Sequence, residues 1–366
     1  GYTGAGRAVA VLDTGIDLDH PFFADAIVAE ACFSAGGKTD GTTGLSLCPK
    51  DALGNERHEV IGAGAADAET TRCREAPECS HGTHVAGIAA GGRPFVTYPG
   101  VAPDAGIVAI QVFTRSNCGT EAAPVPCLTG WPTDLLRALE YVRNNAAALN
   151  VAAVNLSVES LKEVVVGGVT TYEHYTAVCD NDDDVTKSFK RAIDNLLAAG
   201  IPTVTAAGNQ GTLNVDGVTF PGCISSAVTV GATGTTRVEE PGKTPQYTHA
   251  PLSNRGSQLD LFAPGTVSAT PTTPPRGVIS ALVGSPAPGD PPPAAHYGPM
   301  EGTSQAAPHV AGALAVLKQA FPATSGADLV ALLRSSGEPV TYRLGGLDFT
   351  TPRIDVSAAY VDGGGT

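Results

Sequence analysis

The 366-residue sequence is poor in charged residues, in lysine and in long apolar segments. Charged residues make up 16% of the chain, against ~25% in an average soluble domain, and hydrophobic residues make up 42%. This balance excludes a disordered acidic chain, which would combine high charge with low hydrophobicity. No run of ~18 uncharged apolar residues occurs, so we expect no membrane partner. The net charge of −14 and only seven lysines argue against a nucleic-acid partner.

No CxxC pair occurs among the eight cysteines, so neither a zinc ribbon nor a thioredoxin-like redox site is indicated. The even number and the loop-like sequence after each cysteine favour four disulfides over eight reduced thiols, because disulfides persist in exported proteins. Four disulfides therefore predict a secreted, extracellular protein. Because the chain starts at Gly1 without Met or a signal-like segment, we interpret it as a processed or trimmed form. Eight cysteines allow about 105 pairings, and the sequence does not choose among them. The simplest pairing is local: Cys32–Cys48, Cys73–Cys79, Cys118–Cys127 and Cys179–Cys223.

Short, continuously apolar runs alternate with helical patterns along the chain. Continuous apolarity is typical of parallel strands that are buried on both faces. In the helical segment at 133–148, leucine and valine side chains fall on one face, behind Thr133, which can cap the first turn. We expect strands at 8–12, 107–113, 151–156, 202–206 and 227–231, and helices at 84–90, 133–148, 185–199, 305–320 and 326–335.

This alternation predicts an α/β fold with right-handed crossovers, that is, a doubly wound, mostly parallel sheet with helices on both faces. Long loop inserts at 34–71, 114–130 and 267–299 interrupt the pattern, and the last contains Pro274-Pro275 and Pro291–Pro293. Core-type sequence resumes after each insert, so none resembles a domain linker. We therefore expect a single domain at 1–362, followed by a C-terminal tail at 363–366.

Two candidate catalytic residues stand where predicted elements end or begin. Asp13 follows the first predicted strand, and the carboxyl ends of strands in an open α/β sheet border the functional crevice. Its carboxylate is either structural, binding turn amides, or functional. His81 opens the segment Ser80-His81-Gly82-Thr83-His84, where a helix dipole would keep a catalytic base neutral. Metal binding by the two histidines has little support because the HExxH pattern is absent, and we interpret His84 as a packed structural residue.

Ser304 precedes a predicted helix with Pro308 in its first turn, a position at which serine is usually only a helix cap. The segment is not a GxSxG elbow, because Ala306 stands where the last glycine should be. The chain order Asp13, His81, Ser304 also differs from the Ser, Asp, His order of α/β-hydrolases. It is the order of the Asp-His-Ser triad in subtilisin-type enzymes.

Taken together, the segments around these three residues resemble those of the subtilisin-like serine proteases, the subtilases. The resemblance rests on three blocks in the right order: Asp13-Thr14-Gly15-Ile16-Asp17, His81-Gly82-Thr83-His84-Val85-Ala86-Gly87, and Gly302-Thr303-Ser304 followed by Ala306-Ala307-Pro308-His309. It extends to a closing segment at 353–359. The resemblance implies a subtilisin-like fold in which Asp13 orients the imidazole, His81 is the general base and then acid, and Ser304 is the nucleophile.

The same resemblance implies further site residues. Asn209, in Thr205-Ala206-Ala207-Gly208-Asn209, would donate its side-chain amide to the oxyanion, together with the backbone N–H of Ser304. Ser157, Val158 and Glu159 would belong to the strand that pairs with substrate and forms one wall of the S1 pocket, and Thr219 would line its far end. The family usually has glycine in place of Glu159. This carboxylate either favours basic residues in the substrate or is a solvated charge.

We expect no metal in catalysis, and we expect the usual calcium site of the family to be absent from this chain. That site uses an aspartate nine residues beyond the triad Asp and a loop behind the His helix, which here are Phe22 and residues 92–98. Phe22 and Pro94 offer no side-chain oxygen to a hard cation. Structural calcium remains possible elsewhere, for example at residues 180–184, although this run is also a typical exposed acidic loop.

The sequence therefore predicts a secreted serine endopeptidase that acts on proteins or peptides through an acyl-enzyme. We expect a monomer, released from an N-terminal pro-region. Two other hypotheses stay open: a subtilase whose acyl-enzyme is resolved by an amine, making it a transpeptidase or peptide cyclase, and an inactive subtilase fold that serves as a binding module.

Overall fold

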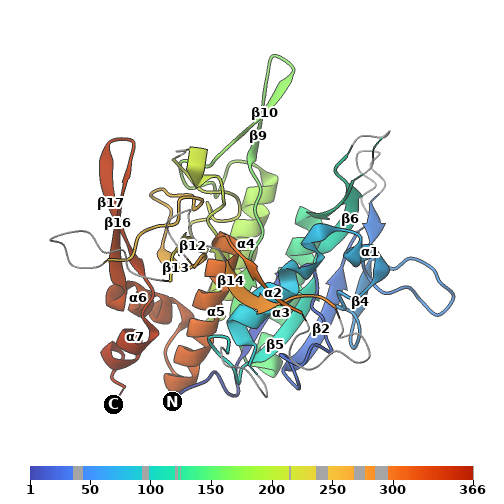
Figure 1. Ribbon diagram of the computed structural model, residues 1–366, viewed down its shortest axis with the longest axis horizontal. Coiled ribbons are helices and arrows are strands. Elements are labelled where there is room, and N and C mark those ends of the chain that lie inside the picture. Colours follow the sequence, from blue (N-terminus) through green and yellow to red (C-terminus); the bar gives the residue numbers. More distant parts are fainter. Residues whose placement is uncertain are drawn as a thin grey trace.

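Ten strands form the central sheet, in the order β16-β17-β13-β12-β11-β8-β1-β5-β2-β4 (Figure 1). The structure is a computed structural model that describes residues 1–35, 44–92, 99–119, 123, 125–213, 216–235, 246–267, 277–284 and 296–365. The eight inner strands pair in parallel, and β4 and β16 each pair antiparallel with their neighbour at an edge. The sheet strands are β1 (Ala8–Asp13), β2 (Ile27–Phe33), β4 (Glu59–Ile61), β5 (Gly106–Gln111), β8 (Val151–Leu156), β11 (Thr203–Ala206), β12 (Val228–Thr233), β13 (Leu261–Pro264), β16 (Glu338–Leu344) and β17 (Leu347–Arg353).

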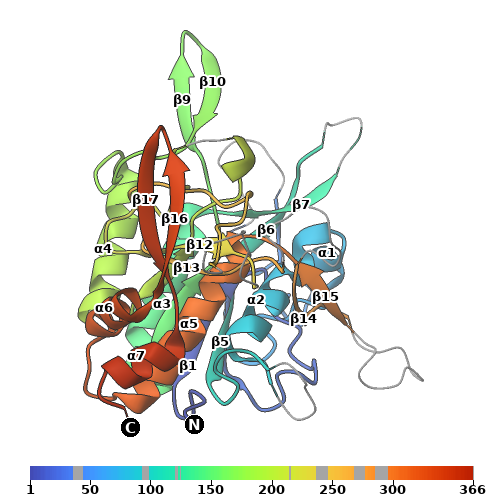
Figure 2. The same ribbon diagram turned by 60° about the vertical axis from the view of Figure 1, so that its left-hand side comes forward.

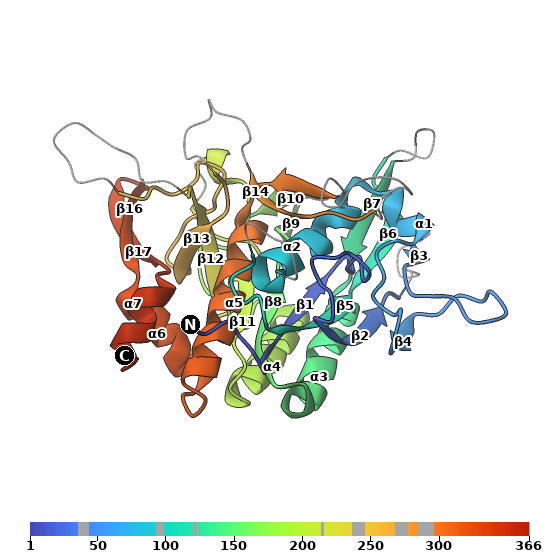
Figure 3. The same ribbon diagram turned by 60° about the horizontal axis from the view of Figure 1, so that its bottom comes forward.

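Helices cover both faces of this sheet, as the sequence predicted. Helices α2 (His81–Ala90) and α5 (Thr303–Ala320) lie side by side across one face, and α6 (Gly326–Ser336) and α7 (Val356–Asp362) pack beside α5 (Figures 1 and 3). Helices α3 (Pro132–Leu149) and α4 (Asp184–Ala198) pack on the other face. Each side has its own apolar core, and the alanine-rich α2 and α5 approach the sheet closely. A Cβ at Gly82 would lie 2.3 Å from the carbonyl oxygen of Gly15, so the start of α2 requires glycine there.

Smaller antiparallel sheets surround the central one. β3 (Leu45–Ser46), β6 (Phe113–Asn117) and β7 (Pro126–Gly130) form one sheet, and β14 (Val278–Ala281) pairs with β15 (Tyr297–Met300). The hairpin of β9 (Lys162–Val166) and β10 (Val169–Glu173) projects from the body of the molecule, as does the hairpin β16–β17 (Figure 2). A short helix α1 (Thr71–Arg74) and two 3₁₀ turns (Pro77–Ser80 and Gly211–Leu213) complete the described elements. No described helix is long and apolar enough to cross a membrane.

The predicted elements are largely confirmed, with three corrections. Thr133 does not cap α3, because the helix begins one residue earlier, at Pro132, with Trp131 at the cap position. The expected strand at 107–113 ends at Gln111, since Phe113 begins β6 of another sheet. The inserts are not wholly irregular, because β6 pairs with β7 and β14 pairs with β15. The two proline clusters of the last insert, Arg93 to Tyr98, and Thr366 of the tail lie outside the described residues.

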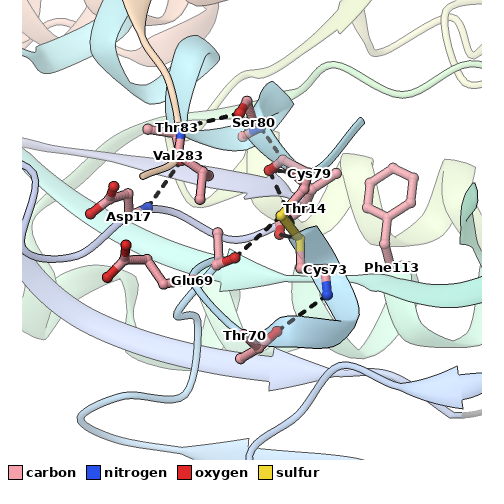
Figure 4. Close-up of a disulfide and its surroundings, with 12 residues drawn as sticks. Thr14, Asp17, Glu69, Thr70, Cys73, Cys79, Ser80, Thr83, Phe113 and Val283 are labelled. Atoms are coloured by element: carbon pink, nitrogen blue, oxygen red, sulfur yellow. Dashed lines mark hydrogen bonds between the residues drawn. A yellow bond between two sulfur atoms is a disulfide. The ribbon is translucent and has the colours of Figure 1, made fainter. Parts of the chain in front are cut away.

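All four disulfides form with the predicted local pairing: Cys32–Cys48, Cys73–Cys79, Cys118–Cys127 and Cys179–Cys223. The second joins α1 to the 3₁₀ turn directly before His81 (Figure 4). The fourth ties the segment before α4 to the loop after Thr219, where Cys179 N–H also donates to the carbonyl of Cys223. Two of the four thus brace chain segments that border the candidate site.

Candidate active site

The predicted site residues meet at one edge of the central sheet. Strands β11, β8 and β1 are neighbours and parallel, so their carboxyl ends lie together. Asp13 ends β1, Ser157 directly follows β8, and Asn209 follows β11. His81 and Ser304 come from the first turns of α2 and α5, which pack on the same face of the sheet.

Asp13 and His81 form a direct pair. His81 Nδ1 lies 2.8 Å from Asp13 Oδ1, which also accepts from the backbone N–H of Thr14 at 2.8 Å. Asp13 is buried, and His81 is partly exposed to the cleft. Burial lowers the pKa of His81, but the charge and hydrogen bond of Asp13, with smaller contributions from Glu159 and Glu78, outweigh it and raise the pKa overall. The pair holds one ring nitrogen in place and leaves Nε2 for proton transfer.

Ser304 lies in the first turn of α5 and lines the same cleft as His81. Its Oγ lies 3.5 Å from the carbonyl oxygen of Ser157, and the Ser157 hydroxyl donates to the carbonyl of Ser304 at 2.9 Å. No hydrogen bond joins Ser304 to His81 within the described part of the chain. Catalytic hydrogen bonds of this kind are often long without substrate and tighten when it binds.

Asn209 is oriented by the residue that precedes the serine. Its Oδ1 accepts from the backbone N–H of Thr303 at 2.8 Å, which leaves Nδ2 as the free donor of a side chain that lines the cleft. Gly302 makes this approach possible, because it has φ of +154° and a Cβ there would lie 3.2 Å from Asn209 Oδ1. The backbone N–H groups of the first turn of α5, including that of Ser304, have no partner inside the helix. Two donors can therefore face one oxyanion.

The cleft has a volume of about 1140 Å³ and is lined by His81, Ser157, Val158, Glu159, Asn209 and Ser304, among others. Thr219 lies instead in an adjoining pocket of about 300 Å³, which shares Glu159, Ser160 and Leu161 with the cleft. Thr219 is buried, and its hydroxyl has no hydrogen-bond partner in the described structure. Glu159 thus stands between the two spaces.

Glu159 is held by neutral groups. Its Oε1 accepts from Gln210 Nε2 at 3.1 Å, and its carboxylate also accepts from the backbone N–H of Asn209. Although the residue is exposed along part of its length, burial of the carboxyl group raises its pKa, against the effect of these hydrogen bonds. Gln210 and Thr303 were not predicted as site residues, but both directly adjoin predicted ones in the sequence.

The other residues that the sequence analysis discussed as metal ligands pack in the core or bind other protein groups. His84 is buried, with Nε2 2.9 Å from the carbonyl oxygen of Val278, and burial lowers its pKa to about 4. Phe22 packs against Phe23 and Tyr297. Carboxylates of the acidic run bind separate partners: Asp180 accepts from Ser225, Asp182 pairs with Lys162, and Asp183 caps α4.

The fold and the arrangement of this edge point to a serine hydrolase of the subtilisin type, and the comparisons identify the family. The model of the family described as "Subtilase family" matches residues 4–349 of the chain. The chain therefore belongs to the subtilases and is a serine protease by class. It is 27% identical over 360 residues to subtilisin E of Bacillus subtilis, covering 98% of this chain and 67% of that protein. It is also 27% identical over 329 residues to an intracellular serine protease of Paenibacillus polymyxa, covering 89% and 71%.

Solved structures agree on the fold. Sphericase superposes with a TM-score of 0.60 at 21% identity, covering 92% of this chain and 84% of that one. A cold-adapted subtilisin-like serine proteinase superposes with a TM-score of 0.55 at 23% identity, with the same coverages. At these identities the likeness concerns the fold alone.

Proposed function

We propose that the chain is a secreted serine endopeptidase with Asp13, His81 and Ser304 as its triad and Asn209 as an oxyanion donor. The observation that carries the proposal is the 2.8 Å contact between His81 Nδ1 and Asp13 Oδ1 at the border of a cleft that Ser304 and Asn209 also line. The chemistry uses only side chains and backbone of the chain itself. Its substrates are proteins or peptides.

In the proposed reaction, Ser304 Oγ attacks the scissile carbonyl carbon while its proton passes to His81 Nε2. Asn209 Nδ2 and the Ser304 N–H donate to the resulting oxyanion. His81 then gives its proton to the leaving amine, which departs and leaves an ester on Ser304. Water then attacks the ester carbonyl carbon while it gives a proton to His81; the intermediate collapses, the acid leaves, and His81 returns the proton to Ser304 Oγ. Asp13 keeps the proton on Nδ1 and stabilises the imidazolium.

The proposal that the protein is secreted rests on the four disulfides, which form and persist in oxidising compartments.

Mass analysis of the products from one unstructured protein separates the proposed hydrolysis from the alternatives. Hydrolysis adds one water at each cut, as OH on the acyl fragment and H on the amine fragment, so the summed fragment masses exceed the parent mass by one water per cut. Transpeptidation or cyclisation gives joined or circular products in which the acyl group has been passed to an amine instead of water, and a binding module gives no products.

Asn209→Ala is expected to lower kcat by about 10²–10³-fold with little change in KM, a magnitude borrowed from the equivalent amide of subtilisin. The interaction forms mainly in the transition state, so the ground-state complex should bind as before. Steady-state kinetics on one peptide substrate measure both constants. A change in KM alone would assign Asn209 to substrate binding instead.

The cleft also favours substrates with basic side chains. Carboxylates of Glu78, Glu159, Glu163, Asp182 and Asp183 line it, whereas Lys162, the lysine among its described lining residues, already pairs with Asp182. Gln210, next to the proposed oxyanion donor, lines the pocket behind Glu159 together with Thr219, which the resemblance assigns to the S1 pocket. We infer that this pocket receives the side chain on the acyl side of the scissile bond. A Lys or Arg there can replace Gln210 as the partner of Glu159 and reach the free hydroxyl of Thr219.

Glu159→Gln is therefore expected to lower kcat/KM for a P1 Arg peptide by about 10-fold or more, since a hydrogen bond to a charged group contributes about 1.5–3 kcal/mol. The same peptide with P1 Leu should change little. Glu173→Gln is the matched control, because Glu173 is exposed on β10 and lines neither space. Equal losses on both peptides would show that Glu159 does not select charge.

A further inference from the structure

A second group of acidic side chains lies behind the triad, where two backbone segments run together. Ile16 and Asp67 pair in a parallel bridge, with N–H donation from Ile16 to Ala66 and from Ala68 to Ile16. This pairing brings Asp17 and Asp19 beside Glu69, and one carboxylate oxygen of each lies within 4.8 Å of the others. Figure 4 shows the carboxylates of Asp17 and Glu69 directed to the same side, away from the Cys73–Cys79 disulfide.

Asp17 provides the second, independent observation. Its side chain is 0% exposed. Oδ2 accepts from the backbone N–H of Gly284 at 3.0 Å, but Oδ1 has no hydrogen-bond partner in the described structure. A buried carboxylate oxygen without a donor is costly, and buried charges in proteins are normally paired or bound to metal.

Among the residues that the structure describes, no basic side chain pairs with Asp17 or Asp19. None of the ion pairs found between described residues includes Asp17 or Asp19. Burial raises the pKa of Asp17; the N–H of Gly284 acts against this, and the adjacent carboxyl group of Asp19, which comes within hydrogen-bonding range, and the charge of Glu69 raise the pKa further. Burial also raises the pKa of Asp67, against the N–H of Glu69 and with smaller effects of the Glu69 and Asp19 charges. Asp17 and Asp19 thus place two carboxylates next to one buried oxygen without a donor, with the carboxylate of Glu69 close by.

We propose that Asp17, Asp19 and Glu69 form a binding site for one Ca²⁺ ion. The donors are all carboxylate oxygens, which suit a hard cation, and no nitrogen or sulfur ligand is among them to favour zinc. Ca²⁺ tolerates irregular geometry, whereas Mg²⁺ demands a near-ideal octahedron. The position differs from that of Phe22, where the resemblance places the usual calcium aspartate.

The ion would join two segments that carry the proposed catalytic pair. Asp17 lies four residues after Asp13, and its N–H donates to Thr83 Oγ1 in the first turn of α2 (Figure 4). Glu69 precedes Thr70, which caps α1, and α1 leads through the Cys73–Cys79 disulfide to His81. The bound ion would therefore stabilise the fold around the site without taking part in the reaction, and the inference does not depend on the proposed function.

The test uses the whole chain, inhibited with phenylmethylsulfonyl fluoride so that it cannot digest itself, and depleted of metal with EDTA. Calorimetric titration with CaCl₂ and thermal unfolding at rising Ca²⁺ are measured for the wild type, Asp19→Asn and Glu69→Gln. The matched control is Asp184→Asn, because Asp184 is fully exposed in the first turn of α4. Neither test variant removes the buried Asp17, so both are expected to fold.

We expect Ca²⁺ to bind and to raise Tm in the wild type and in Asp184→Asn, and Mg²⁺ to do so more weakly. Asp19→Asn and Glu69→Gln should each weaken Ca²⁺ binding at least 10-fold and lose most of the rise in Tm. Ca²⁺ affinity that is unchanged in both test variants would overturn the proposal. So would stabilisation by acidification but not by Ca²⁺, which would show that the carboxylates share a proton instead.

Discussion

Ser304→Ala is expected to reduce peptide hydrolysis by about 10⁶-fold while the chain stays folded, a magnitude borrowed from loss of the nucleophile in subtilisin. The substitution removes the oxygen that forms the acyl-enzyme and leaves the oxyanion donors and the cleft in place. Ser304 is 8% exposed in the first turn of α5, where alanine fits the helix without strain. Kinetics on one peptide, with circular dichroism and Tm for folding, measure the two effects separately.

Ser335→Ala is the control for this experiment, because Ser335 is an exposed residue of α6 away from the cleft. It should retain full activity. If Ser304→Ala kept more than a small fraction of wild-type kcat, another residue would have to be the nucleophile, and the proposed triad would be wrong.

Asp13→Asn is expected to lower kcat by about 10⁴-fold, the cost of the same change in a trypsin-type triad. An amide is close to the carboxylate in shape and can occupy the same buried position, but it carries no charge and can present N–H to the imidazole. His81 would then lose the acceptor that keeps the proton on Nδ1, 2.8 Å from Asp13 Oδ1. The ring would be held in the wrong tautomer, with Nε2 unable to accept the serine proton.

The pH profile distinguishes this role from a merely structural one. A general base must be neutral, so kcat/KM falls as the pH drops through the pKa of His81. Because Asp13 raises that pKa, the acid limb of the wild type should lie above the ordinary pKa of 6.5. Asp13→Asn should shift the limb to lower pH. A lower rate with an unshifted acid limb of the pH profile would show that Asp13 acts only by supporting the turn after β1, where it accepts from the N–H of Thr14.

The parallel core and the triad could be predicted because their signals are local. A continuously apolar strand such as Val151–Leu156 indicates burial on both faces. Each proposed triad residue lies in a short sequence block that can be recognised by itself. The hairpin β16–β17 was not predicted, although Val340, Tyr342 and Leu344 alternate with exposed residues as a half-buried strand should. The period-two signal was present there but was weaker than the helical patterns around it.

Features that depend on long-range pairing could not be predicted. The acidic group at Asp17 and Glu69 exists only because Ile16 pairs with Asp67, and nothing near either position in the sequence specifies that bridge. The contact of Gln210 with Glu159 likewise joins the ends of two strands, β11 and β8, that are far apart along the chain. Sequence patterns locate such residues at strand ends, and the sheet order then decides which of them meet.

Labelling with phenylmethylsulfonyl fluoride tests the central claim, that Ser304 is the nucleophile activated by His81, most directly. The wild type is treated until activity is lost, digested, and mapped by mass spectrometry, with His81→Ala treated in parallel. We predict one adduct per chain, on Ser304, which forms in step with the loss of activity and is absent from His81→Ala. An adduct on a different serine that forms in step with inactivation, with Ser304 unmodified, would contradict the account.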